Sequence, residues 1–305
     1  MSAVPVSEAV RIGGVPRRIV AFVDVLGFRA LVETIPQCEL VDVYRKLQQA
    51  TDLQTARTVF PDDQRRFDSD AYYEDFELAR RRVVNVVMAS DSIVVYSSAD
   101  TWQDAWAVLA ATRGLVVAGF RNGLALRGAA AIGDLDEIEF EEDAGDPGNW
   151  TARFAGLVGL GLVRAYELES QCDWSGAILH PDLVAHLDQI EMSRHEDGVL
   201  TALETSCNIR LVVATEVPMK HERPDGGIEV VSEKHWAVNW PFLCDSADWG
   251  LTEDQVARSF TSFGRHASTG VERKRDATLA FMRGAERDAV ATLEERRRTW
   301  RPGES

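Results

Sequence analysis

The stretch RRIVAFVDVLGFRALVE (17–33) decides the fold of this chain. It opens with an apolar run typical of a buried strand, places one carboxylate, Asp24, near the end of that run, and passes through Gly27 into a helical apolar periodicity. A second apolar run, VVNVVMASDSIVVYSS (83–98), also contains one carboxylate, Asp91, between two serines. Because burying an ionised carboxylate is costly without compensation, this pair predicts a divalent-cation site.

Composition places the chain among soluble globular proteins, with 305 residues, 45% of them hydrophobic and 27% charged. No apolar run approaches the roughly 20 residues that span a bilayer, and the first residues lack the layout of a signal peptide. The four cysteines form no CxxC pair, as expected for reduced thiols. We therefore expect a cytoplasmic protein without membrane contact.

The net charge of −16 argues against a general nucleic-acid binder, which would need a basic face. It leaves a nucleotide substrate open, because a metal ion and a few local cations suffice to hold a triphosphate.

The order of the predicted elements is strand, helix, strand, strand, helix, strand. These elements are a strand at 17–25, a helix at 28–50, a hairpin at 83–97, a helix at 101–120 and a strand at 124–135. This β-α-β-β-α-β order predicts an α+β fold, an α/β sandwich with a ferredoxin-like core. Residues 51–80 are expected to form an irregular or helical insertion.

Further elements follow this core. They are an acidic loop or ribbon at 134–149, a helix within 156–171, a strand at 175–181 with a short helix opening at Pro181, two or three strands within 199–240 that include 209–217 and 235–242, and a helical tail at 252–300.

In this topology Asp24, at the end of the first strand, and Asp91, at the hairpin tip, are expected to converge at one edge of the sheet. Two carboxylates with a flanking backbone carbonyl can hold two Mg²⁺ or Mn²⁺ ions, which favour an in-line displacement at phosphorus. Gly27 permits a close approach of a phosphate, and the helix that starts near Phe28 offers free N–H donors.

Each residue alone has an ordinary structural interpretation. Asp91 is also a typical turn residue, and Asp24 is also a typical helix cap. Arg127, beside Gly128 on a predicted buried strand, is equally well explained as the partner of a buried charge. The combination of these residues in this order is more specific than any one of them.

Four segments together resemble the class III nucleotidyl cyclases. FVDVLGF (22–28) and MASDSIVVYS (88–97) resemble the two metal motifs of that family, LRGAAAIGDL (126–135) resembles its Arg-x-Gly-Ile strand, and GLGLVRAYELE (159–169) occupies the place of a Gly-rich turn that opens a helix. The resemblance covers about residues 17–180. Within the family, the details are most similar to the pyrimidine cyclases of bacterial Pycsar anti-phage systems.

The resemblance implies a homodimer with active sites at the subunit interface. It implies conversion of UTP or CTP to cyclic UMP or cyclic CMP with release of pyrophosphate, uridylate cyclase being favoured, and a product that activates a separate effector. It also implies a cyclase domain at 1–245 and a helical C-terminal extension at 246–305.

Two departures from the purine cyclases narrow this interpretation. Purine cyclases usually carry a lysine shortly before the second metal aspartate, whereas this chain has the sequence VVMA at 86–89. The Asn-x-x-x-Arg pair of the helix is also out of register, because 163–167 reads VRAYE. The alternatives are a purine cyclase in signalling and a non-catalytic nucleotide-binding or dimerisation module. A third alternative, a metal-dependent phosphohydrolase, would typically need more His and Asp ligands, and the six histidines show no tight paired spacing.

The resemblance assigns roles residue by residue. Asp24 and Asp91 are expected to hold two metal ions, with the Val25 carbonyl as an extra ligand. The remaining site residues are amides near Leu26, Gly27 and Phe28 for the phosphates, Arg127 or the partner subunit's Arg164 for the developing charge, and Tyr166 for the base or ribose. For Tyr166 and Phe28, packing is the favoured alternative.

Overall fold

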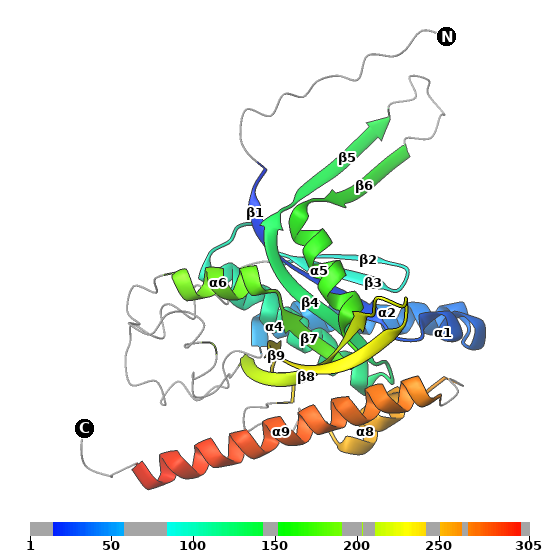
Figure 1. The fold of residues 1–305 in the computed structure, drawn as a ribbon. Coiled ribbons are helices and arrows are strands. Elements are labelled where there is room, and N and C mark those ends of the chain that lie inside the picture. Colours follow the sequence, from blue (N-terminus) through cyan, green and yellow to red (C-terminus); the bar gives the residue numbers. More distant parts are fainter. Residues whose placement is uncertain are drawn as a thin grey trace.

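The computed structural model describes residues 15–57, 84–142, 152–190, 203, 211–241, 251–263 and 268–299. Its centre is a seven-stranded sheet with the order β2-β3-β1-β4-β7-β9-β8, shown in Figure 1. No helix within these ranges combines the length and the apolar character needed to cross a membrane.

The first half of the sheet has the predicted ferredoxin-like arrangement. Strand β1 lies between β3 and β4 and is antiparallel to both, and β2 pairs with β3 as a hairpin. The elements of this half are β1 (Arg17–Val25), α1 (Phe28–Thr34), α2 (Gln37–Arg57), β2 (Asn85–Ala89), β3 (Ser92–Tyr96), α4 (Trp102–Arg121) and β4 (Leu126–Asp134). The β-α-β-β-α-β order predicted from the sequence is therefore confirmed.

Three later strands extend this sheet beyond β4, first a parallel strand and then an antiparallel pair, and two others pair as a separate ribbon. The elements after β4 are β5 (Asp136–Glu142), β6 (Ala152–Val158), α5 (Leu160–Gln171), β7 (Gly176–Leu179), α6 (Pro181–Gln189), β8 (Val212–Glu222), β9 (Ile228–Val238), α8 (Glu253–Ser259) and α9 (Thr269–Thr299). In Figure 1 the β5–β6 ribbon projects from the sheet, and α8 and α9 lie together at its opposite end.

Three element boundaries differ from the sequence expectation. The helix expected at 28–50 is two helices, because Pro36 cannot continue the first, and the second runs on to Arg57. Most of the insertion expected at 51–80 lies outside the described residues. The strands expected at 209–217 and 235–242 are longer, and they lie at Val212–Glu222 and Ile228–Val238. The acidic segment forms ribbon strand β5 over its first part.

Strand β1 presents two different faces. Ile19, Ala21, Val23 and Val25 are buried in the main core, which also contains the apolar side of α4. The intervening side chains point to the opposite face, where Val20 and Phe22 pack with residues of β3, β6 and α5. Because side chains alternate along a strand, Asp24 lies on this second face, away from the main core.

The N-terminal turn of α5 packs unusually close to β4. A Cβ atom added at Gly133 would lie 2.5 Å from the Gly161 nitrogen and 2.9 Å from its Cα. Both atoms belong to backbone, so the contact can be relieved only by moving the helix away from the strand.

We expect Gly133→Ala to lower the free energy of unfolding by about 1–3 kcal/mol, since overpacking of this size displaces backbone. Gly284→Ala on α9 is the matched control, because its added Cβ meets nothing within 4 Å. This control should leave stability unchanged or raise it by up to about 1 kcal/mol, as alanine favours helix. Urea unfolding measures both, and equal midpoints for the two variants would contradict the close packing.

Candidate active site at one edge of the sheet

The two aspartates predicted to form the site lie at the same edge of the sheet. In the strand register Asp24 stands between Ser92 of β3 and Arg127 of β4. The amide of Val25 donates a 2.9 Å hydrogen bond to the carbonyl of Asp91, which ties the hairpin tip to the end of β1. The convergence expected from the topology is thus present.

Burial and neighbouring charges both shift the pKa of Asp24. Its side chain is 22% exposed, and burial raises the pKa of the carboxyl above its ordinary value of 3.8. The neighbouring charge of Asp91 raises the same pKa, whereas Arg127 and the Val25 amide lower it. Two carboxylates that repel each other in a half-buried position form a site that a cation would stabilise.

Arg127 connects the aspartate to α5. Its Nη2 lies 3.6 Å from Asp24 Oδ2, its Nε donates to Glu169, and its Nη1 donates a 3.1 Å hydrogen bond to the Cys172 carbonyl. Glu169 is only 3% exposed, and burial raises the pKa of its carboxyl, with Asp24 adding to the rise and Arg127 opposing it. Arg127 is therefore the counter-ion of a buried carboxylate as well as a neighbour of Asp24.

The turn after β1 has the backbone geometry that its glycine suggested. Gly27 has φ 74° and ψ 25°, a left-handed conformation that favours glycine, and it precedes α1. The Leu26 amide donates to the Ala125 carbonyl at 3.0 Å, so the expectation that this amide binds phosphate is not met. The corresponding expectation for the Gly27 and Phe28 amides stays a prediction.

Phe28 faces the hairpin. Its ring contacts the ring of Tyr44 edge-on, with centroids 6.2 Å apart, and it packs against the main core. The same ring lines a cavity of about 340 Å³ together with Gln37, Leu40, Val41, Tyr44, Arg45, Gln48, Met88 and Ser90. Phe28 therefore serves packing on one side and remains accessible from this cavity on the other.

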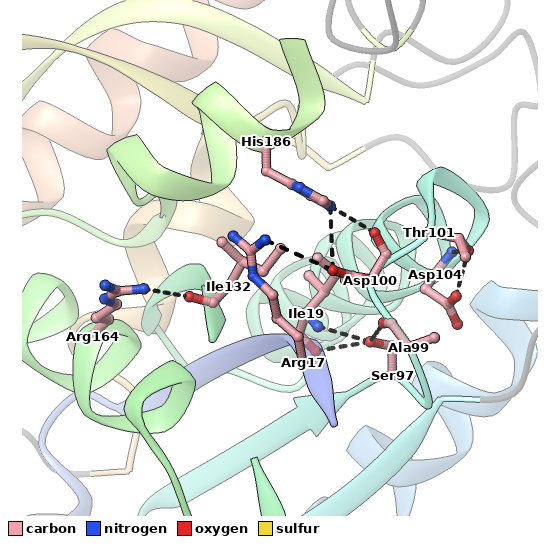
Figure 2. Close-up of polar contacts among 10 residues, drawn as sticks. All are labelled: Arg17, Ile19, Ser97, Ala99, Asp100, Thr101, Asp104, Ile132, Arg164 and His186. Carbon is pink, nitrogen blue, oxygen red and sulfur yellow. Dashed lines mark hydrogen bonds and ion pairs between the residues drawn. The ribbon is translucent and has the colours of Figure 1, made fainter. Parts of the chain in front are cut away.

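Arg164 lies at the far end of α5 from this edge. Figure 2 shows its guanidinium directed at the Ile132 carbonyl, a hydrogen bond of 2.9 Å, and its Nη2 lies 3.0 Å from Asp182 of α6. In β4, Ile132 pairs with Ile19, five residues along from the pairing of Arg127 with Asp24. Within one subunit Arg164 is therefore not brought to the aspartates.

The polar contacts around Arg164 continue into a network that fixes α6. His186 Nε2 lies 2.7 Å from the Asp100 carbonyl, and Arg17 Nη1 lies 3.9 Å from the Asp100 carboxylate (Figure 2). Ser97 bonds to the backbone of Ile19 at the same end of β1. These contacts link chain segments at the end of the sheet opposite to the aspartates, which is a structural role.

Tyr166 is not part of the core. Its side chain is 55% exposed, and its ring meets the ring of Phe22 edge-on with centroids 5.4 Å apart. The interpretation of Tyr166 as a core residue was therefore wrong, because its side of α5 covers the second face of the sheet only in part. A contact with base or ribose stays a prediction.

The donor set at the edge suits a hard divalent cation. Asp24 and Asp91 offer carboxylate oxygens, and the Val25 carbonyl belongs to the same strand end. Within the described ranges no group of three or more His, Cys, Asp or Glu side chains is arranged around one point as a ready metal site. Mg²⁺ usually binds through one or two protein carboxylates and completes its shell with water and phosphate oxygens, so two carboxylates fit this ion.

Two residues that sequence reasoning left without a role, Tyr44 and Lys220, also face this edge. Tyr44 donates a 2.7 Å hydrogen bond to the Ser90 carbonyl, and burial together with Asp91 and Asp24 raises the pKa of its hydroxyl. Lys220 of β8 donates to the Ser170 carbonyl at 3.1 Å, and burial with Arg127 and Lys274 lowers its pKa. The strand pattern offers no signal for Lys220, while Tyr44 was one member of a helical apolar stripe.

We expect Tyr44→Phe to lower the free energy of unfolding by about 0.5–1.5 kcal/mol, the usual net value of one hydrogen bond. The ring contact with Phe28 is kept, so the loss reports the bond to Ser90 alone. Because Ser90 precedes Asp91, this bond also helps to fix the position of the hairpin tip. An unchanged urea midpoint would show that Tyr44 does not hold the hairpin tip.

Comparison with known proteins gives distant similarities to solved structures. Neither a scan against protein-family models nor a search of curated proteins gave a match. One solved structure of a bacterial light-regulated adenylyl cyclase is similar with a TM-score of 0.40 and 12% identity, over 75% of this chain and 92% of that one. A second structure of a bacterial light-regulated adenylyl cyclase has a TM-score of 0.41 and 9% identity, over 88% of this chain and 58% of that one.

The catalytic core of a rhodopsin-guanylyl cyclase with converted specificity, in complex with ATPαS, has a TM-score of 0.38 and 10% identity, over 73% of this chain and 96% of that one. The mixed α/β fold of the chain is given by its own strands and helices.

Proposed function

We propose that this protein is a nucleotidyl cyclase that depends on divalent metal ions and converts a nucleoside triphosphate to a 3′,5′-cyclic monophosphate and pyrophosphate. The observation that carries the proposal is the position of Asp24 and Asp91 at one sheet edge, where the Val25 amide bonds the Asp91 carbonyl at 2.9 Å. The pKa of Asp24, raised by burial and by Asp91, supports a pair that needs a cation.

In this proposal Asp24, Asp91 and the Val25 carbonyl hold Mg²⁺ or Mn²⁺, two ions per site. When bound, such ions lower the pKa of the ribose 3′-hydroxyl and stabilise the leaving pyrophosphate. Gly27 lets the phosphates approach the backbone, where the Gly27 and Phe28 amides lie at the start of α1. Arg127 and Lys220 supply positive charge that balances the phosphates as the leaving group develops.

The proposed substrate is a pyrimidine triphosphate, UTP in preference to CTP. The support is chemical: β2 offers Val86, Val87 and Met88 where a purine cyclase has a lysine, so no ammonium group is available there to read a purine base. Following the resemblance, the cyclic nucleotide would act as a second messenger in anti-phage defence by activating a separate effector.

The proposed active form is a homodimer with its sites at the interface. Exposed apolar side chains support an interface on the second face of the sheet, namely Val87 of β2 and Val163 and Tyr166 of α5. Arg164 would act across this interface, contributed by the partner subunit. The chain is further proposed to comprise a cyclase domain at 1–245 and a helical extension at 246–305.

The test is pyrophosphate release from each of the four ribonucleoside triphosphates in Mn²⁺, with and without a chelator. We expect release from UTP, less from CTP, little from ATP or GTP, and none after chelation. Release from ATP or GTP alone would favour the purine cyclase, and nucleotide binding without any release would favour a non-catalytic module.

A further inference from the structure

Helix α9 is attached to the chain beside the site by three neighbouring contacts. Arg273 Nε donates to Asp173 Oδ2 at 2.5 Å, and the Ser175 amide donates to Thr278 Oγ1 at 2.9 Å. Between them the ring of Trp174 packs on Phe281, with centroids 4.7 Å apart. Residues 173–175 directly follow Cys172, whose carbonyl accepts from Arg127. The first turns of α9 are therefore fixed next to Arg127 and the residues that it contacts, namely Asp24, Glu169 and Cys172.

Lys274 lies on the inward stripe of this helix. It precedes Thr278 by four residues and Phe281 by seven, both of which are buried, so the three share one face. The Lys274 side chain is itself half-buried. Lysine is seldom placed on a buried stripe unless its ammonium group has a partner.

No such partner is found in the described part of the chain. Among these residues Lys274 Nζ makes no hydrogen bond and has no carboxylate oxygen within 4.0 Å. The carboxylate that attracts Lys274 most, Asp173, is 1% exposed and already pairs with Arg273, while its Oδ1 has no hydrogen-bond partner. Lys274 is therefore attracted by the charge of Asp173 but forms no direct ion pair with it.

Charged groups of both signs around Lys274 shift its pKa. Burial lowers the pKa of its ammonium group, and the nearby Arg127 and Arg273 lower it further, while Asp173 and Asp24 oppose the change. The charge of Lys274 in turn lowers the pKa of Lys220. Lys274, Lys220 and Arg127 are thus neighbouring positive charges that Asp24, Asp173 and Glu169 balance in part, and a bound anion would relieve the repulsion between them.

We propose that Lys274 binds the phosphate chain of the substrate, so that α9 completes the active site. This inference rests on the proposed function and deepens it, because it assigns the C-terminal helix to the triphosphate. The half-buried ammonium group on the inward stripe, the clamp at 173–175 and the adjacent Arg127 carry it together. Lys274 meets the phosphates from α9, while the carboxylates at the strand ends hold the metal.

Calorimetric titration with inorganic tripolyphosphate in Mg²⁺ tests the proposal without any need for turnover. Lys274→Gln should weaken binding about tenfold or more, the scale of a lost charge-assisted hydrogen bond. Lys274→Arg should keep most of the affinity. Lys234→Gln, which removes an exposed lysine of β9, is the matched control and should bind as the parent protein does.

The parallel assay is the Michaelis constant for UTP, which should rise in Lys274→Gln by a factor similar to the loss in tripolyphosphate affinity. Parent-like binding and kinetics in Lys274→Gln would overturn the proposal, as would equal losses in Lys274→Arg and Lys274→Gln at unchanged melting temperature. If no triphosphate is converted but tripolyphosphate binding still depends on Lys274, the cyclase function fails while this phosphate site stands.

Discussion

Asp24→Asn should reduce metal-dependent cyclisation about a thousandfold or more while the protein stays folded. The carboxylate that is lost would hold both ions, which together contribute several kcal/mol to an in-line displacement. Asparagine keeps the shape of the side chain between Ser92 and Arg127, so the strand register is preserved. The measurement is the rate of cyclic nucleotide formation in Mn²⁺, beside a far-ultraviolet circular dichroism spectrum.

Asp134→Asn is the matched control, because Asp134 is an exposed carboxylate at the other end of β4. It should turn over as the parent protein does. Turnover in Asp24→Asn within tenfold of the parent rate would contradict the metal assignment.

The stability of Asp24→Asn should also depend on pH differently from that of the parent protein. Because the pKa of Asp24 is raised in the folded protein, this group contributes stability below its ordinary pKa of 3.8, and the contribution is lost as pH rises through the folded value. In Asp24→Asn this loss is absent. The difference in unfolding free energy between variant and parent should therefore move in favour of the variant as pH rises through that window, and a pH-independent difference would contradict it.

Arg127→Met should lower the free energy of unfolding by about 3–5 kcal/mol, the cost of leaving one member of a buried ion pair without its partner. The group left behind is Glu169, which is 3% exposed and whose pKa burial already raises. The Cys172 carbonyl loses its donor in the same change. Urea unfolding at neutral pH measures the loss.

Two further variants separate this cause from a general loss of packing. Glu169→Gln added to Arg127→Met should recover much of the stability, because the uncompensated charge is removed. Arg29→Met removes an exposed partner of Glu33 on α1 and should leave the urea midpoint unchanged. Additive losses in the double variant would contradict the ion-pair explanation.

Local sequence patterns were sufficient to predict the first half of the fold. The apolar alternation around Asp24, the serines that flank Asp91 and the glycine at position 27 predict strand, hairpin and turn, because each signal lies within a few residues of its consequence. The break between α1 and α2 at Pro36 was not predicted, because the apolar periodicity of the sequence continues across it.

The charge environment of the site could not be obtained in this way. Glu169 meets Arg127 from 42 residues away, and α9 docks on residues 173–175 from a hundred residues away. Such contacts depend on how helices pack, which neither composition nor spacing reports. Arg164 illustrates the converse: its helix was correctly predicted, but its guanidinium bonds Ile132 and Asp182 at the other end of α5.

The central claim is that Asp24 and Asp91 hold the metal ions of a nucleotide cyclase selective for pyrimidines. Its most direct test is mass spectrometry of the products formed from an equal mixture of ATP, GTP, CTP and UTP in Mn²⁺, with the parent protein and Asp24→Asn side by side. We predict that cyclic UMP is the main product of the parent protein and that no cyclic nucleotide forms with the variant. Absence of any cyclic nucleotide from the parent protein, or equal formation by both, would contradict the claim.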